Sequence, residues 1–372
     1  MLYYGYCTWD ISSYVSFYRD NRFIYYYVIT IYLIMNSSRL RIFKFFSIFL
    51  FVFPMILIVN NSSFSVNALS DQIELKKILL IADENILKIS PDNVFHPGGI
   101  YYNAMTFNGS IPGPAIEVDE GEVFQLTVRN DGDLVHSIDL HGINGPSQAL
   151  SGSIPPGINK TIEIKAESPG VFVYHCDGDN LNGIWDHIAS GMYGGLIVHS
   201  KNEPPAKEFF ISFNEIYNNK DLGFFKGTNN TIGMFDMYKF LNNTPDLILT
   251  NGMAYKYFPF MGTMAKITIN ENADLFNVKV GELTRWYVIN AGPRNEITFN
   301  FAGGMIDKVI NGETKSFFNS SAVQNIYDIV IPPGEGKILE TTFPEEGIYV
   351  GNDHDIGNFI KGAGFVINAN KN

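Results

Sequence analysis

The chain has 372 residues, of which 46% are hydrophobic, so it is long enough for two domains with substantial cores. Its net charge of −12 argues against nucleic acid or an anionic membrane surface as a partner. Short apolar and β-branched runs, rich in Phe and Tyr and interrupted by Gly and Pro, predict an all-β protein.

The segment 1–68 has the organisation of a targeting region. Basic residues at 39–44 precede an apolar run at 45–59, and a polar stretch with small residues then ends at Ala68. Because the run is short for a membrane span, we expect a signal peptide beginning at Met35; an uncleaved N-terminal anchor is the alternative. In either case the folded part is predicted to lie outside the cytoplasm, in an extracellular or periplasm-like space.

Two motifs occur once in each half of the chain. One is an IPPG turn followed by an aromatic strand, and the other is a strand that begins with a Gly-Glu pair. The matched segments are 120–130 with 280–290, 154–157 with 331–334, and 168–177 with 344–354. This repeat predicts two homologous β-domains, at 75–200 and 205–370, with residues 216–245 as an insertion that has no counterpart.

Each half also has the pattern of a Greek-key β-sandwich. Apolar residues alternate with polar ones along the strands, for example at Phe124, Leu126 and Val128. Gly, Asn and Pro interrupt the strands at roughly the spacing of such a fold. The loops of a sandwich gather at its ends, so side chains from distant parts of the chain can converge there.

The segment 173–192 concentrates side chains that bind metals. Cys176 is one of only two cysteines, and His187 and Met192 follow it in the pattern Cys-x10-His-x4-Met. His136 lies forty residues upstream. A thiolate and two imidazoles with a weak axial thioether form a type 1, or blue, copper electron-transfer site. Each residue alone would more often be a core residue, and the combination carries the prediction.

A second metal site is predicted beside the first. His175 precedes Cys176 on one strand, so the two side chains face opposite ways. His141 follows the upstream ligand by five residues, an odd spacing that also reverses the face. His141 and His175 can therefore meet on the outside of the first domain, and His354, in GNDHD of the second, remains as a third imidazole.

These segments resemble the multicopper oxidase superfamily, and in particular the copper-containing nitrite reductases. The resemblance extends over about 100–370 and rests on FNGSIPGPAIEVDEGEVFQLTVRN, LVHSIDLHG and VYHCD. It implies two cupredoxin domains, a homotrimer and two coppers per subunit. The implied type 1 ligands are His136, Cys176, His187 and Met192, and the implied type 2 ligands are His141 and His175 of one subunit with His354 of the next.

The resemblance also implies an activity, the one-electron reduction of nitrite to nitric oxide. The type 2 copper would bind nitrite, and the type 1 copper would supply the electron that it receives from a redox donor protein. Cys176 and His175 are adjacent, so a short bonded path would join the two coppers. Asp139, in HSIDLH, matches the aspartate that hydrogen-bonds to nitrite and protonates it in that family.

The chain departs from the family pattern in its second half. Met305, in FNFAGGMIDKV, stands where the family has a catalytic histidine, and a thioether cannot donate a hydrogen bond or carry a proton. By chain position, Asp353 corresponds to Cys176 and Asn300 to His136, so we expect no blue copper in the second domain.

Three alternatives to nitrite reduction follow from these departures and from the residue counts. The site could act on another small nitrogen compound, or the protein could be a cupredoxin electron carrier or copper-binding protein with a vestigial type 2 site. A laccase-like oxidase is disfavoured, because a trinuclear copper cluster needs more histidines than the seven present. In addition, Asp177 follows the cysteine where a laccase has histidine.

Overall fold

The computed structural model describes most of the chain after the predicted leader. The described residues are 75–93, 96–143, 151–179, 182–201, 203–222, 232–258, 260–263, 266–269, 273–311 and 323–371. The chain divides into two units, Met1–Leu69 and Ser70–Asn372, and only the second contains described residues. The leader at 1–68 therefore lies outside them and stays a prediction. Within the described ranges, no helix combines the length and the apolar character needed to cross a membrane.

The described residues form mainly β-strands with short helices between them. The elements up to residue 199 are β1 (Lys76–Ser90), β2 (Ile100–Phe107), β3 (Ile116–Asp119), β4 (Val123–Asn130), β5 (Asp139–Leu140), β6 (Asn159–Lys165), β7 (Gly170–His175), β8 (Gly178–Asp179), β9 (Asn182–Gly183), α1 (Ile184–Ala189) and β10 (Tyr193–His199). Those that follow are β11 (Lys207–Ile216), β12 (Ile232–Gly233), α2 (Met237–Leu241), β13 (Leu247–Thr250), β14 (Phe260–Thr263), β15 (Lys266–Ile269), β16 (Phe276–Lys279), β17 (Leu283–Gly292), β18 (Ile297–Ala302), β19 (Ile306–Asn311), β20 (Val323–Ile326), β21 (Asp328–Ile331), β22 (Glu335–Thr342), β23 (Gly347–Asp353), α3 (Ile356–Ile360) and β24 (Gly364–Asn370).

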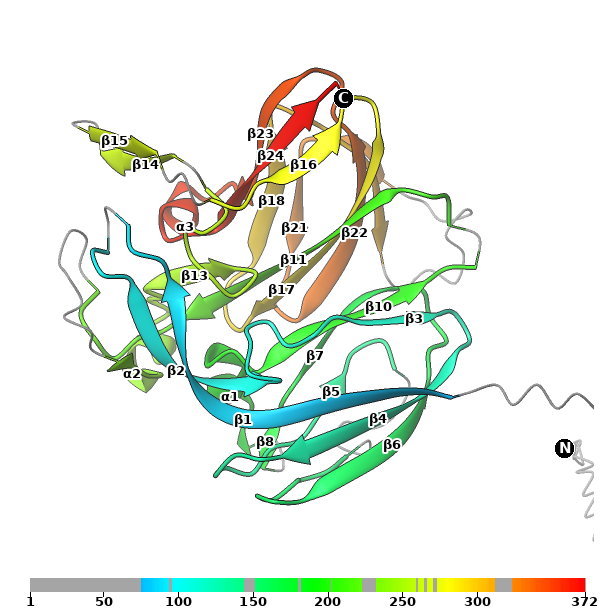
Figure 1. The fold of residues 1–372 in the computed structure, drawn as a ribbon, viewed down its shortest axis with the longest axis vertical. Helices are drawn as coiled ribbons and strands as arrows, with labels where there is room; N and C mark the ends of the chain where they lie inside the picture. Colours follow the sequence, from blue (N-terminus) through cyan, green and yellow to red (C-terminus); the bar gives the residue numbers. More distant parts are fainter. Residues whose placement is uncertain are drawn as a thin grey trace, which may run out of the picture. The chain divides into compact units, whose positions relative to one another are not determined.

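The first sandwich consists of two sheets, with strand orders β12-β2-β1-β4-β6 and β3-β10-β7-β5 (Figure 1). Phe124, Leu126 and Val128 of β4 point into the core between them, as their alternation predicts. The same core contains Cys176 and Met192, which are fully buried. Two of the predicted metal ligands are therefore held by the packed interior rather than by a surface loop.

The second sandwich has sheets of order β13-β11-β17-β22-β19-β20 and β16-β24-β23-β18-β21. Its core is aromatic: Trp286 stacks on Phe209 and Phe365, with ring centroids 4.2 and 5.4 Å apart. The two sandwiches share a third cluster, in which Val171 and Val173 of β7 pack with residues of β17 and β22 such as Ile289. This contact brings the turn before β22 to the strand that precedes Cys176.

The predicted insertion at 216–245 contributes to the first sandwich as well as connecting strands of the second. Its β12 pairs in parallel with β2, with Ile232 opposite Tyr101. Helix α2 follows, capped by Asp236, whose side chain accepts a hydrogen bond from the Lys239 N–H. The remainder of this stretch, residues 223–231, lies outside the described ranges.

The internal repeat extends to individual hydrogen bonds. The Asn130 side chain donates to the carbonyls of Leu134 and Ile154 and accepts from the Gly132 N–H. In the second sandwich, the Asn290 side chain donates to two carbonyls and accepts from one N–H in the same way, and its partners are Asn295, Ile331 and Gly292. A buried amide with every group satisfied fixes the same strand crossing in both halves.

The strand register corrects one predicted equivalence between the halves. His136 pairs with Ile154 of the first IPPG turn, and Ile297 pairs with Ile331 of the second. Ile297, not Asn300, therefore corresponds to His136, and the Asn300 assignment was wrong. Asn300 instead corresponds to Asp139, because it lies opposite Asn352 as Asp139 lies opposite His175.

Candidate metal centres

Backbone hydrogen bonds hold the three predicted ligands of the Cys-x10-His-x4-Met segment together. Cys176 directly follows β7, His187 lies in α1, and Met192 directly precedes β10. The Cys176 N–H donates to the Met192 carbonyl at 3.1 Å, and the Met192 N–H donates to the His187 carbonyl at 2.9 Å. The short helix α1 was not predicted. It makes the segment after Cys176 more compact, so that His187 lies close to Cys176.

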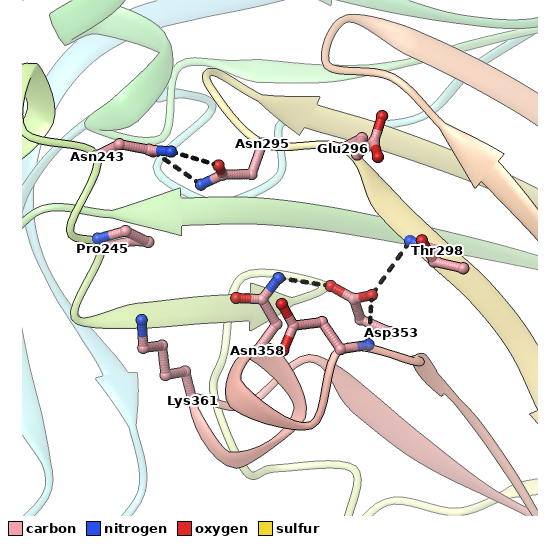
Figure 2. Close-up of a pocket in the computed structure, with 9 residues that line it drawn as sticks. Asn243, Pro245, Asn295, Glu296, Thr298, Asp353, Asn358 and Lys361 are labelled. Atoms are coloured by element: carbon pink, nitrogen blue, oxygen red, sulfur yellow. Dashed lines mark hydrogen bonds between the residues drawn. The ribbon is translucent and has the colours of Figure 1, made fainter.

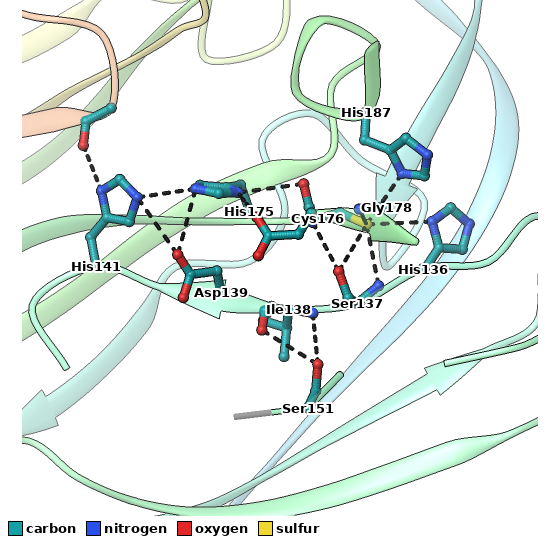
Figure 3. Close-up of polar contacts among 12 residues, drawn as sticks. His136, Ser137, Ile138, Asp139, His141, Ser151, His175, Cys176, Gly178 and His187 are labelled. Carbon is teal, nitrogen blue, oxygen red and sulfur yellow. Dashed lines mark hydrogen bonds and ion pairs between the residues drawn. The ribbon is translucent and has the colours of Figure 1, made fainter. Parts of the chain in front are cut away.

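The structure brings His136, Cys176 and His187 into one buried cluster (Figure 3). The Cys176 Sγ lies 3.2 Å from His187 Nδ1 and 3.7 Å from His136 Nδ1. Both Nδ1 atoms thus face the sulfur, and Met192 is buried in the same core. This donor set, two imidazoles and a thiolate with a neighbouring thioether, has the chemistry of a type 1 copper site.

Burial keeps these groups neutral in the absence of a metal. It raises the pKa of the Cys176 thiol to about 12 and lowers the pKa of His187 to about 4. The N–H groups of Ser137 and Gly178 each lie 3.3 Å from the sulfur and favour the thiolate. A bound cation supplies the remaining stabilisation that the thiolate needs, so metal binding would release a proton here.

Glu84 of β1 orients the upstream histidine and was missed by the sequence analysis. Its Oε1 lies 2.9 Å from His136 Nε2, while its Oε2 accepts a hydrogen bond from the Asp133 N–H at 2.8 Å. A proton on Nε2 leaves Nδ1 free to bind a metal, as in carboxylate–histidine–metal triads. Glu84 is 52 residues from His136 in the chain, and no local motif links the two.

The second predicted site also forms around β5 and the end of β7. His141 Nε2 and His175 Nε2 are 3.0 Å apart, and Asp139 Oδ2 lies 4.0 Å from each (Figure 3). The carbonyl of Gly334, in the second IPPG turn, lies 2.8 Å from His141 Nδ1. A proton on that Nδ1 leaves Nε2 unprotonated, so the second sandwich orients this ligand.

The two imidazoles are arranged to share one positive ion. Burial and the neighbouring His175 both lower the pKa of His141, which favours the neutral ring that metals bind. Two nitrogens 3.0 Å apart can occupy adjacent positions on one metal, given metal–nitrogen bonds of about 2.0–2.1 Å. The side chains present therefore fit a type 2 copper that still needs a further ligand.

His354 does not join this cluster within one chain. It follows β23 in the second sandwich, its side chain is 46% exposed, and its Nδ1 lies 3.6 Å from Asp328 Oδ2. Among the described residues, the candidate metal group at this site contains Asp139, His141 and His175 only. A single chain thus presents two imidazoles in one place and a third, solvent-accessible imidazole elsewhere.

Met305 occupies an exposed turn of the second sandwich. It directly precedes β19, the residue is 44% exposed, and its carbonyl accepts a hydrogen bond from Thr341 Oγ1 at 2.6 Å. The side chain offers no proton donor at this position. Within the described residues, Met305 itself therefore supplies no proton at the position where the resemblance implies a histidine.

The second sandwich replaces the type 1 cluster by a hydrogen bond beside a cavity of about 290 Å³ (Figure 2). In the first sandwich the Cys176 N–H donates to the Met192 carbonyl, and the Met192 N–H donates to the His187 carbonyl. In the second sandwich the Asp353 N–H donates in the same way to the Ala363 carbonyl, and the Ala363 N–H donates to the Asn358 carbonyl. Asp353, Asn358 and Ala363 therefore occupy the three ligand positions. The Asn358 side chain donates to Asp353 Oδ2 at 2.7 Å, and burial raises the pKa of Asp353. The predicted equivalence of Asp353 with Cys176 is confirmed.

Comparisons with known proteins agree with this geometry. The sequence model of the family described as multicopper oxidase matches residues 88–203. The chain is 31% identical to the copper-containing nitrite reductase of Neisseria meningitidis serogroup A over 273 residues, which are 71% of this chain and 64% of that protein. It is 28% identical over 281 residues to the copper-containing nitrite reductase of Pseudomonas chlororaphis, which covers 69% of this chain and 70% of that protein.

A solved structure of a copper nitrite reductase from Nitrosomonas europaea is similar over 80% of this chain and 95% of its own, with a TM-score of 0.67 and 28% identity. These findings confirm the resemblance to copper-containing nitrite reductases and the all-β, cupredoxin-like fold that the sequence predicts. The chain spans just under two thirds of the length of the Neisseria relative, at 64%.

Proposed function

We propose that the protein is a copper oxidoreductase that reduces nitrite to nitric oxide. The observation that carries this proposal is that two different candidate metal-binding clusters meet at consecutive residues. Cys176 belongs to the buried cluster with His136 and His187, and His175 belongs to the cluster with His141 and Asp139 on the opposite side of the strand. An electron accepted at the first cluster can therefore reach the second through a short bonded path.

Copper at these clusters would supply one-electron redox chemistry, and at the imidazole cluster it would also bind and polarise the nitrite oxygens. His136, Cys176, His187 and Met192 would hold the type 1 copper. His141 and His175 would hold the type 2 copper. Reduction of nitrite to nitric oxide consumes one electron and two protons and releases water, so the second cluster must also receive protons.

Asp139 is the group best placed to handle such a proton. Its Oδ2 is 4.0 Å from both imidazole nitrogens, and its side chain is partly exposed, so it can exchange protons with solvent. From this position the protonated Asp139 carboxyl can donate to an oxygen of nitrite bound at the copper that the two histidines would hold. Since Met305 carries no proton, Asp139 would be the principal proton donor of this protein.

A homotrimer in which His354 of a neighbouring subunit completes the type 2 site is part of the proposal. Within one chain the site has two imidazoles, and His354 is exposed and separate from them. Exposed apolar residues accompany it on the second sandwich: the Tyr327 ring lies 5.7 Å from that of His354, and Val330 and Ile356 are also exposed. Such a surface is suited to burial against another copy.

Export and a redox donor protein are the remaining parts of the proposal. Export rests on the charged and apolar pattern of residues 1–68. The donor would deliver electrons one at a time to the type 1 cluster, where His187 is the imidazole on the short helix α1. The net charge of −12 favours a donor with a basic docking surface.

An electron carrier with a vestigial second site is the alternative, and the exposed Met305 favours it. Nitric oxide release from nitrite with a small reductant, measured together with copper per subunit, separates the two functions. Two coppers with nitric oxide release, abolished or strongly slowed in Asp139→Asn, support the reductase. Two coppers without nitric oxide point to another small nitrogen compound as substrate. One copper per subunit without turnover would support the electron carrier.

A further inference from the structure

Asp177 is a buried carboxylate to which the proposed reaction assigns no role. It directly follows Cys176, its residue is 1% exposed, and its Oδ1 lies 3.2 Å from His175 Nδ1. Among the described residues, His175 Nδ1 is the group placed to donate to that oxygen, and no other donor reaches it. A buried carboxylate oxygen without a donor is costly unless a positive charge lies nearby.

The surroundings of His175 determine which of its nitrogens carries the proton. Nδ1 faces two oxygens, Asp177 Oδ1 at 3.2 Å and the Cys176 carbonyl at 3.4 Å. Nε2 faces His141 Nε2 instead. An N–H on Nδ1 bonds to the Cys176 carbonyl and turns its positive end toward Asp177 Oδ1, and it leaves the lone pair of Nε2 directed at the proposed type 2 copper, as in carboxylate–histidine–metal triads.

The charge of Asp177 is otherwise unbalanced. Its only ion-pair contact among the described residues is with His175. Its backbone N–H donates a hydrogen bond to Ser137 Oγ. A copper ion bound at His175 Nε2 would be the nearest positive charge. A negative charge separated from the copper by one imidazole ring stabilises copper(II) relative to copper(I).

From these contacts, and on the basis of the proposed function, we infer that Asp177 is a positioning residue for the type 2 copper. It holds His175 in the Nδ1–H tautomer with Nε2 toward the metal, and it lowers the reduction potential of that copper. Because a lower potential disfavours copper(I), the same carboxylate reduces the fraction of molecules in which the electron resides on the type 2 copper rather than on the type 1 copper. It acts through His175 and does not touch the substrate.

The test compares Asp177→Asn with Asp179→Asn in the copper-loaded full chain. Both variants remove one negative charge from the same loop. The Asp179 side chain, however, is exposed and accepts a hydrogen bond from Ser153 Oγ. The readouts are the type 2 copper(II) paramagnetic resonance spectrum, the reduction potentials of both coppers, and retention of type 2 copper against a chelator. Type 1 absorption reports whether the fold and the Cys176 site are intact.

In Asp177→Asn we expect a higher type 2 reduction potential, altered type 2 hyperfine splitting and about 10–100-fold weaker type 2 copper retention. Asp179→Asn should match the parent. Asp177→Ala should repeat the result, because it removes the charge without introducing an amide donor.

An unchanged type 2 reduction potential in Asp177→Asn overturns the inference. Equal shifts of the type 1 and type 2 reduction potentials in both Asp177→Asn and Asp179→Asn also overturn it. Absence of type 2 copper from the parent protein also overturns it. These readouts do not depend on turnover. If the parent binds type 2 copper but releases no nitric oxide, the proposed function fails while the inference is still judged by the potential.

Discussion

Replacing Glu84 by alanine is expected to weaken copper binding at the type 1 cluster. Glu84 Oε1 lies 2.9 Å from His136 Nε2, and the carboxylate is largely buried, with 20% of the side chain exposed. A hydrogen bond to a charged group in such a place contributes about 1.5–3 kcal/mol. Loss of such an outer partner of a metal ligand typically costs about 10–100-fold in metal affinity, which is the same energy range.

The assay is competition for copper between the protein and a soluble chelator, followed by the thiolate-to-copper absorption. Glu84→Gln keeps an oxygen acceptor and removes the charge, so it should fall between the parent and Glu84→Ala. Glu122→Ala is the matched control. Its carboxylate also accepts a backbone hydrogen bond, from the Asp119 N–H at 2.8 Å, but it lies on the surface away from the cluster.

Parent-like copper affinity in Glu84→Ala would refute this reasoning. It would mean that packing alone holds the His136 ring, which is fully buried, with Nδ1 toward the sulfur. A loss of affinity in Glu122→Ala of the same size would be equally damaging, because it would assign the effect to general destabilisation of the first sandwich.

Three further predictions concern the shared site, the metal-free protein and the second sandwich. His354→Ala should lose the type 2 copper and keep the type 1 absorption, and unchanged copper content would contradict a shared site. The metal-free protein should lose stability on acidification. The pKa of His187 falls from 6.5 when unfolded to about 4 when folded, so its contribution is present above 6.5 and lost as the pH falls through 4. The free energy of unfolding, measured by chemical denaturation, should fall by about 3 kcal/mol between a pH above 6.5 and a pH below 4. Equal free energies of unfolding at these two pH values would be the contrary result. Asn358→Ala leaves Asp353 Oδ2 without its donor and should destabilise the protein by about 1–3 kcal/mol at unchanged copper content; a loss of copper instead would show that the sandwiches are coupled.

Local spacing accounts for the parts of the site that the sequence predicted. Adjacent residues of a strand face opposite ways, so Cys176 and His175 had to serve different sites. The odd spacing of His136 and His141 reverses the face in the same way. Alternation likewise predicted which side of β4 is buried. These relations are set by covalent geometry, which is the same wherever the strand lies in the fold.

The register between the halves required the tertiary structure. The loops that join corresponding strands differ in length, so chain position aligned Asn300 with His136. Only the pairing of Ile297 with Ile331, beside that of His136 with Ile154, shows the true correspondence. Strand pairing depends on hydrogen bonds between distant segments, and spacing within one segment cannot specify it.

The sequence by itself determined the types of the candidate ligands, their order and the strand faces on which they lie. The tertiary structure decided which distant groups orient them: Glu84 for His136 and the Gly334 carbonyl for His141. It also left His354 apart from the other two imidazoles. Orienting groups come from other strands and from the second sandwich, so their positions follow from how sheets pack, and no local pattern in the chain encodes that packing.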